Sequence, residues 1–202
     1  MIAHVFYKCG VLTLPAVLGA IIAVESKGDP YALNVNGDVE LVRAPGDYEQ
    51  AVAMARWLER HGYSFDAGLA QVNSTNFAWL GLTVESVFEP CTNLRAAARV
   101  LEECQERATV RFGPGRRALA AAVSCYNTGD FARGVLNGYV GAVLASAAGA
   151  LATRPVAARA REGEPGESRG QVAHSGPEAF ARRSARRAAP DPSTTFASRE
   201  RQ

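Results

Sequence analysis

The stretch from Val11 to Val24 carries no charged side chain, and a chain that folds in water has to bury it. It is too short to span a bilayer as a helix, which needs about 20 apolar residues. Its length suits the apolar part of a signal peptide, but no small-residue cleavage site separates it from the polar residues that follow. We therefore predict a core helix that starts at Thr13, with Pro15 in its first turn, and find no evident export signal.

An acidic residue continues the inner stripe of this helix. The stripe advances in steps of four and three, and the next step of four reaches Glu25, just before a break at residues 28–30. Burial would raise the pKa of this carboxyl, and a protonated carboxyl is the group that donates a proton in glycosidic bond cleavage. By itself the pattern also fits a solvated glutamate at a helix end. The earlier positions of the stripe are Leu14, Leu18 and Ile21.

Turn residues and a capping signal divide the next part of the chain. Residues 34–46 contain Asn-Gly-Asp and Pro-Gly pairs, which predict a small hairpin or a loop excursion. Asp47 followed by Gln50 is a variant of the capping box and predicts the start of a helix that ends at Gly62.

Three further helices follow. Apolar positions at helical spacing predict one from about Asn93 to Arg107, and a Gly-Pro-Gly break at residues 113–115 separates it from a second that stops at Gly129. The last begins near Tyr139. We expect a compact, mainly α domain over residues 1–152, with the small hairpin or loop as its only departure from helix.

Residues 153–202 differ in composition. Residues 1–150 hold 12 Lys or Arg against 14 acids, whereas residues 151–202 hold 10 Arg against 6 acids. The tail lacks a sustained hydrophobic period, which predicts disorder. A basic tail can contact an anionic polymer, acidic lipid or nucleic acid, or remain solvated; we expect no nucleic acid as a partner.

The four cysteines lack the paired spacing of zinc ligands, and the three histidines are scattered, so we predict no metal site. Two disulfides in an oxidising compartment are the preferred interpretation over buried free thiols. Three pairings are possible. The cysteines are Cys9, Cys91, Cys104 and Cys125.

Three motifs occur in order along the chain. They are "ESKGDPYA" from Glu25, "GLAQVN" over residues 68–73 and "AAVSCYNTG" over residues 121–129. Together, over roughly residues 12–145, they resemble the lytic transglycosylases with a goose-type-lysozyme-like, α+β fold. The stretches "NVNG", "CTNLRAAARVLEEC" and "GYV" are similar to those of the members encoded with type IV secretion systems, which open peptidoglycan locally for an envelope-spanning apparatus.

The resemblance implies a role for each motif. Glu25 would be the catalytic acid and base, and Tyr126 would direct its hydroxyl toward the carboxyl or the sugar. Each of three residues also has an ordinary structural interpretation. Ser26 could be a helix-terminal hydroxyl, Gln71 a turn residue and Tyr126 a buried structural aromatic. The implied substrate-binding set is Ser26, Gln71, Asn73, Tyr126 and Asn127. The aromatic residues Trp57, Tyr63, Phe65, Phe77, Trp79 and Tyr139 could include sugar-stacking rings, with Phe77 and Trp79 favoured as core and Tyr139 kept as a weak candidate.

The implied chemistry uses one carboxylate, no metal and no organic cofactor. The bond between N-acetylmuramic acid and N-acetylglucosamine would break with formation of a 1,6-anhydro sugar. A hydrolase would need a second acid, and Asp29 and Asp66 look like caps or solvated loop acids. A lysozyme-type hydrolase, or a non-catalytic module that binds glycan or assembles a secretion apparatus, remain alternatives. The substrate implies the periplasm or cell envelope, with peptidoglycan strands and secretion components as partners.

Three departures from the family pattern affect the first and third motifs. Asp29 replaces a common Asn. Lys27 stands where members generally have Gly, and we expect Gly28 to supply the missing backbone freedom one position later. Thr128 replaces a commoner Ala, which is a small change.

Overall fold

The computed structural model describes residues 6–37 and 41–152. The fold is mainly α with one small antiparallel sheet, which confirms the predicted fold class. The predicted disorder of residues 153–202 lies outside the described residues. The elements are α2 (Pro15–Glu25), β1 (Leu33–Val35), α3 (Tyr48–Arg60), β2 (Phe65–Ala67), β3 (Val72–Asn73), α4 (Phe77–Leu80), α5 (Pro90–Phe112), α6 (Arg116–Thr128), α7 (Arg133–Leu136) and α8 (Tyr139–Ala152), with short 3-10 turns at Ser74–Asn76 and Ser86–Phe88.

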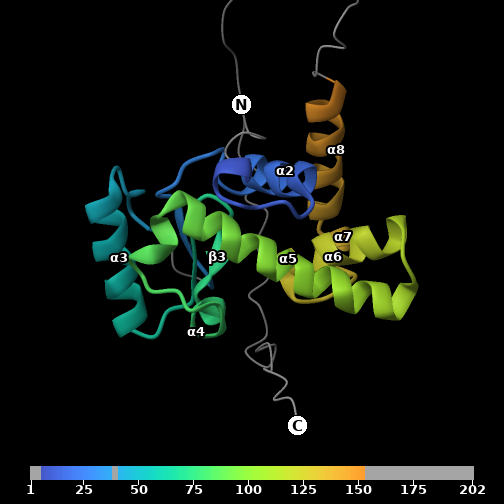
Figure 1. Ribbon diagram of the computed structural model, residues 1–202. Coiled ribbons are helices and arrows are strands. Elements are labelled where there is room, and N and C mark those ends of the chain that lie inside the picture. Colours follow the sequence, from blue (N-terminus) through green and yellow to red (C-terminus); the bar gives the residue numbers. More distant parts are fainter. Residues whose placement is uncertain (1–5, 38–40, 153–202) are drawn as a thin grey trace, which may run out of the picture.

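The long helix α5 runs through the centre of the molecule (Figure 1), with α3 and the sheet toward one end and α6 and α7 toward the other. Helix α2 crosses above it and packs against α8, which rises away from the body. The end of α2 and the start of α8 are thereby brought together, although they are far apart in the sequence.

Helix α2 begins two residues later than predicted. Leu14 precedes it in the left-handed region, with φ of 43°, and Pro15 takes the first helical position, where its missing N–H costs nothing. The Thr13 hydroxyl does not cap the helix. It donates a hydrogen bond to Glu102 on α5, and this tertiary contact explains the shifted start. Leu18 and Ile21 are buried as predicted.

The predicted cap of α3 is confirmed. Asp47 Oδ1 accepts the backbone N–H of Gln50 at 2.8 Å, and the glutamine side chain accepts the N–H of Gly46 at 3.2 Å. Gly62 follows the helix with φ of 73°, a conformation that glycine adopts without strain.

The sheet is not built as a local hairpin within residues 34–46. Its order is β1-β2-β3, and β1 pairs antiparallel with β2, Leu33 opposite Ala67 and Val35 opposite Phe65. Helix α3 lies between these two strands in the sequence. Of the two structures predicted for residues 34–46, the described residues 41–46 form the loop.

Helices α5 and α6 form the largest helical contact of the domain. Helix α5 is longer than predicted because Pro90 starts it and the chain does not leave it until Gly113. The structure selects one of the three cysteine pairings. Cys104 on α5 joins Cys125 on α6, and Cys9 joins Cys91 at the start of α5. The disulfides close loops of 21 and 82 residues. In the chain-entropy model they stabilise the folded protein by about 3 and about 4.5 kcal/mol, because the unfolded chain loses conformational entropy.

A buried asparagine on α5 fastens the loop between β2 and β3. Asn93 is fully buried, and its Nδ2 donates to the carbonyl oxygens of Ala67 and Val87 at 2.9 and 2.8 Å. Its Oδ1 accepts the N–H of Ala70 at 2.9 Å. Gly68 lies against this amide with φ of 78°, so glycine is required both for the backbone conformation and for the close approach.

Substitution of Gly68 tests this packing. In Gly68→Ala the added Cβ would meet the Asn93 amide and lie 2.9 Å from the Val87 carbonyl oxygen, which as a backbone atom has little room to move. We expect a loss of about 2–4 kcal/mol in the free energy of unfolding, measured by urea denaturation. The control is Gly81→Ala, at a similar φ of 67° with open space around it. It should lose only about 1 kcal/mol. Equal losses would contradict the clash.

Candidate active site

The carboxyl group of Glu25 lies at the end of α2, where the helix meets the start of α8. Tyr139, the first residue of α8, donates its phenolic hydroxyl to Glu25 Oε1 at 2.7 Å. Both side chains are half-buried. The backbone N–H of Tyr139 in turn donates to Asn137 Oδ1 at 3.0 Å, which fixes the start of α8. The acid is therefore neither in the core nor free in solvent, and a defined donor orients it.

Ser26 ties the end of α2 to the loop between β2 and β3. Its hydroxyl donates to the carbonyl oxygen of Leu69 at 2.6 Å and accepts the N–H of Gly28 at 3.1 Å. The residue next to Glu25 thus fixes the helix end against the second motif. These are the contacts of a helix-terminal hydroxyl, and the implied role of Ser26 in positioning Glu25 or a substrate group stays a prediction.

The third motif reaches the same loop from α6. Tyr126 donates its hydroxyl to the carbonyl oxygen of Ala70 at 2.8 Å, and its ring is half-buried against the core. The expectation that this hydroxyl points toward the carboxyl or the sugar stays a prediction. The hydroxyl has a backbone acceptor, and the phenol that contacts Glu25 belongs to Tyr139.

Gln71 is buried and forms the far side of the loop. Its Nε2 donates to the carbonyl oxygens of Ala32 and Gly68, both at 2.9 Å, and its Oε1 accepts the amide of Asn34 at 2.6 Å. The backbone is left-handed, with φ of 52°. The side chain therefore joins β1 to the loop, and a role in sugar binding stays a prediction.

The other two predicted substrate residues, Asn73 and Asn127, form hydrogen bonds with side chains of nearby segments. Asn73 donates to Asp66 Oδ1 at 2.8 Å, and its own oxygen accepts the N–H of Thr75 at 2.9 Å as the cap of the 3-10 turn. Asn127 accepts the amide of Asn137 at 3.0 Å. Neither contact involves the carboxyl of Glu25.

The two possible second acids have different surroundings. Asp29 is exposed and accepts the N–H of Tyr31 at 2.9 Å, as expected of a turn residue. Asp66 is buried in the central strand and accepts the amide of Asn73, so the expectation that it is a cap or a solvated loop acid is wrong. The strand pairing places it between Asn34 and Asn73.

Within the described residues, no three or more His, Cys, Asp or Glu side chains gather in a way that could hold a metal ion. None of the helices in the described ranges is long and apolar enough to cross a membrane.

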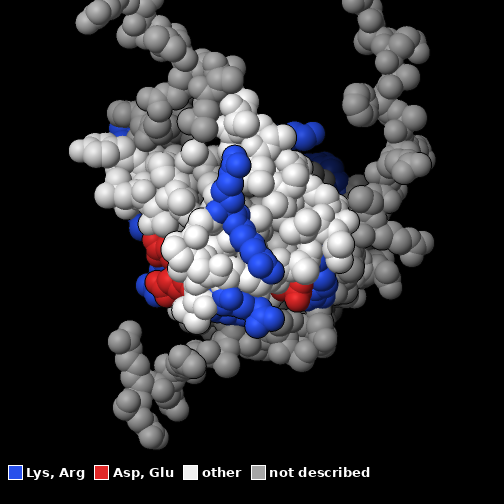
Figure 2. Space-filling model, turned by 90° about the vertical axis from the view of Figure 1, so that its right-hand side faces the viewer, with Lys and Arg blue, Asp and Glu red and all other residues white. Residues whose placement is uncertain are grey.

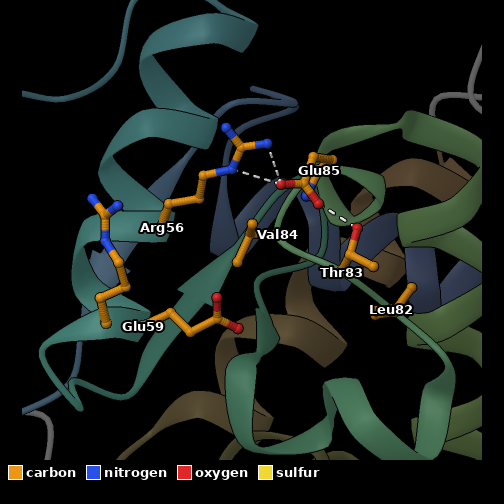
Figure 3. Close-up of a pocket in the computed structure, with 7 residues that line it drawn as sticks. Arg56, Glu59, Leu82, Thr83, Val84 and Glu85 are labelled. Atoms are coloured by element: carbon orange, nitrogen blue, oxygen red, sulfur yellow. Dashed lines mark hydrogen bonds and ion pairs between the residues drawn. The ribbon is translucent and has the colours of Figure 1, made fainter.

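An open hollow of about 460 Å³ lies elsewhere, between α3 and the loop at residues 82–85 (Figure 3). Arg56 and Glu85 form an ion pair of 2.7 Å at its edge. Hydrogen bonds from Thr83 and then from Arg56 hold the pKa of the Glu85 carboxyl below its usual value. The hollow contains none of the three motifs. We regard the end of α2, rather than this hollow, as the candidate site.

The chain belongs to the transglycosylase SLT domain family, whose model matches residues 10–145. That range includes the three motifs, the loop at residues 68–71 and Tyr139. No solved structure gave a significant match.

Among curated proteins, the chain is 39% identical to the type IV secretion system protein virB1 of Brucella suis biovar 1, over 74% of this chain and 64% of that protein. Brucella abortus biovar 1 has a relative of the same name with the same identity and coverage. Protein virB1 of Rhizobium radiobacter is 38% identical over 68% of this chain and 56% of its own length. The chain thus spans a little under two thirds of the Brucella relatives.

Three structural partners of the site were missed or underrated by the sequence analysis. Tyr139 was named only as a possible stacking ring, because no local pattern reveals a contact with a residue so far away in the chain. Asn34 belongs to the stretch "NVNG", which enters the resemblance without a role for Asn34 itself. Asn93 did carry one, since it is four positions before the buried Ala97 on the inner face of α5.

The break after Glu25 differs from the expectation in one respect. Gly28 is left-handed, with φ of 89°, but Lys27 is left-handed as well, with φ of 58°. The lysine therefore adopts a conformation that a glycine would take without strain, at a cost of about 1–2 kcal/mol. Gly28 thus adopts the expected positive φ, but Lys27 adopts one as well.

This strain can be relieved. Lys27→Gly should raise the free energy of unfolding by about 0.5–1 kcal/mol, after the entropy that glycine adds to the unfolded chain is subtracted. The matched control is Lys8→Gly, at another exposed lysine whose φ is not positive, and it should lower stability by about the same amount. Chemical denaturation of both variants measures the difference. Loss of stability in Lys27→Gly would contradict the strain.

Proposed function

We propose that the protein is a lytic transglycosylase that cleaves peptidoglycan between N-acetylmuramic acid and N-acetylglucosamine, leaving a 1,6-anhydro-N-acetylmuramic acid end. The observation that carries the proposal is the half-buried carboxyl of Glu25, oriented by the Tyr139 hydroxyl and adjoined by a serine that fastens the second motif. Membership of the transglycosylase SLT domain family supports the same reaction class.

In the proposed mechanism Glu25 acts twice. As an acid it gives its proton to the oxygen of the glycosidic bond while the C1–O bond breaks. The N-acetyl group of the same sugar stabilises the positive charge that develops at C1. As a carboxylate it then removes the proton from the C6 hydroxyl, whose oxygen bonds to C1. The proton is returned to Glu25, and no water is consumed.

Tyr139 serves this cycle as a positioning residue. Its hydroxyl donates to one carboxyl oxygen of Glu25 and so orients the group that carries and delivers the proton. A hydrogen bond from a neutral phenol also stabilises the carboxylate formed after the first step. Because Tyr139 opens a helix that packs against α2, the two groups are held by rigid elements.

We further propose that the cleavage opens the cell wall locally for a type IV secretion system, in the periplasm or cell envelope. The relatives named as type IV secretion system proteins support this setting, and two disulfides suit an oxidising compartment. Peptidoglycan strands would be the substrate. Components of the secretion system would be the protein partners.

Replacement of the acid tests the reaction. Glu25→Gln keeps the shape of the side chain and removes its titrating proton, so glycan cleavage should fall by at least about 10²-fold while the fold is unchanged. Digests of purified peptidoglycan are analysed by mass spectrometry for anhydromuropeptides. Glu49→Gln, at an exposed acid in the first turn of α3, is the control and should retain activity.

The products separate the alternatives. Hydrated reducing ends in place of anhydro ends would show a lysozyme-type hydrolase and overturn the transglycosylase proposal. The absence of any product from the unaltered protein, with retained binding to peptidoglycan, would show a non-catalytic module. Full activity of Glu25→Gln would contradict the assignment of the acid.

A pair of tyrosine variants separates positioning from loop support. Tyr139→Phe removes the donor to Glu25 and should lower kcat by roughly tenfold or more with KM nearly unchanged, since a hydrogen bond to a charged group is worth about 1.5–3 kcal/mol. Tyr126→Phe removes the donor to Ala70 and should lower stability by about 1 kcal/mol. Steady-state kinetics and denaturation are measured on both variants. Equal effects on kcat would contradict the separate roles.

A further inference from the structure

The turn between α5 and α6 is basic. Residues 107–117 contain four arginines and no acid, and the acids of α5 lie in the turns before it. All four are exposed, and Arg111, Arg116 and Arg117 flank the turn itself. We call the surface that they form with the aromatic rings beneath them the arginine face; it consists of Arg111, Arg116, Arg117, Phe112 and Phe131.

Aromatic rings hold two of the guanidinium groups in place. Arg117 lies over the Phe112 ring at 4.6 Å from its centroid, and Arg111 lies over the same ring at 5.6 Å. The Phe112 ring packs edge to face with Phe131 at 5.6 Å. Both rings are half-buried, so they restrict the arginines while leaving the N–H groups at the edges of the guanidinium planes to face outward.

In the described part of the chain, no carboxylate forms an ion pair with Arg111, Arg116 or Arg117. The one acid between residues 107 and 133 is Asp130, and the backbone N–H groups of Ala132 and Arg133 donate to it at 2.8 and 2.9 Å. These two bonds hold the pKa of Asp130 below its usual value. Its charge is thus used to cap α7.

The first turn of α6 increases this excess of positive charge. Arg116 and Arg117 occupy its first two positions, where the helix dipole is also positive, and no acid lies in that turn. The arrangement is unfavourable in the free protein. A bound anion would relieve it, and a guanidinium group binds carboxylates with paired, directional hydrogen bonds.

The arginine face and the candidate active site lie at opposite ends of α6. Arg117 is in the first turn and Tyr126 in the last, a separation of about 14 Å along the helix. Figure 2 views the molecule from the side on which α5 ends in Figure 1, and Lys and Arg side chains extend across this face with few acids among them. This separation is short enough for a polymer bound at the site to reach the arginines.

We propose that the arginine face binds the carboxylates of the peptide stems of peptidoglycan next to the bond that is cleaved. This inference rests on the proposed function, since it takes the same polymer as ligand. The geometry of the face favours stems over acidic lipid because the Phe rings lie half-buried under guanidinium groups, so the face offers directional charge and no exposed aromatic ring for insertion among acyl chains.

The test measures retention of the full chain on insoluble peptidoglycan. The parent is Glu25→Gln, which prevents turnover during the assay. Addition of Arg111→Gln and Arg117→Gln should weaken retention by about 2- to 30-fold at low salt, the range expected for two exposed charge pairs, and the difference should shrink as salt is raised. The control, Arg60→Gln with Arg99→Gln, removes the same charge from two exposed arginines elsewhere and should leave retention unchanged.

Two further ligands identify what the face binds. On glycan strands stripped of their peptides by an amidase, with the lactyl carboxylates that this exposes converted to methyl esters, the arginine-face variant and the control should bind alike. Vesicles that contain phosphatidylglycerol should show no difference between them either. A loss confined to the vesicles, an equal loss on stripped strands, or an equal loss in the control would overturn the proposal.

Failure of this inference and failure of the proposed function give different results. Cleavage of short, peptide-free glycans by the Arg111→Gln, Arg117→Gln variant with Glu25 intact should equal that of the unaltered protein. Loss of that cleavage would mean that the arginines support the reaction itself and would overturn the separate binding role. Inactivity of the unaltered protein would overturn the proposed function while leaving the retention measurements valid.

Discussion

The backbone carbonyl groups of residues 67–70 are the point on which the site depends. Each accepts a hydrogen bond from a side chain: Asn93 donates to residue 67, Gln71 to residue 68, Ser26 to residue 69 and Tyr126 to residue 70. Three of the donors come from α5, α6 and the end of α2. Because a buried carbonyl left unpaired costs about 1–3 kcal/mol, each of these elements has a preferred position relative to the loop.

The same bonds determine where Glu25 can lie. Ser26 follows it directly, so the bond to Leu69 fixes the end of α2 against the loop, while Tyr139 orients the carboxyl from α8. The Cys104–Cys125 disulfide holds α6 to α5 near Tyr126. The acid is thus positioned from two sides by parts of the chain that are remote in sequence, and the proposed proton transfer requires such preorganisation.

The sequence predicted those features that have a local cause. Helical periodicity and capping residues gave the core helices, and the inner stripe of α2 led to Glu25. Family resemblance directed attention to the loop that holds Gln71. Features that depend on tertiary contacts were not predicted: the contact between Tyr139 and Glu25, the pairing of β1 with β2 across α3, and the burial of Asp66. A pattern of a few residues contains no record of which distant segment will lie beside it.

Two residues near the site have a strained, left-handed backbone, and side-chain hydrogen bonds offset the strain at only one of them. Gln71 is left-handed, and a glycine there would avoid the cost, but a glycine could not bond Ala32, Gly68 and Asn34 at once. Its side-chain bonds offset the strain, so the conformation is the consequence of holding β1 to the loop. The exposed side chain of Lys27 has no comparable set of bonds, although its backbone forms the turn that ends α2 beside Glu25. The comparison of Gln71 with Lys27 shows that a positive φ indicates a functional segment only where the hydrogen-bond partners of the strained residue are known.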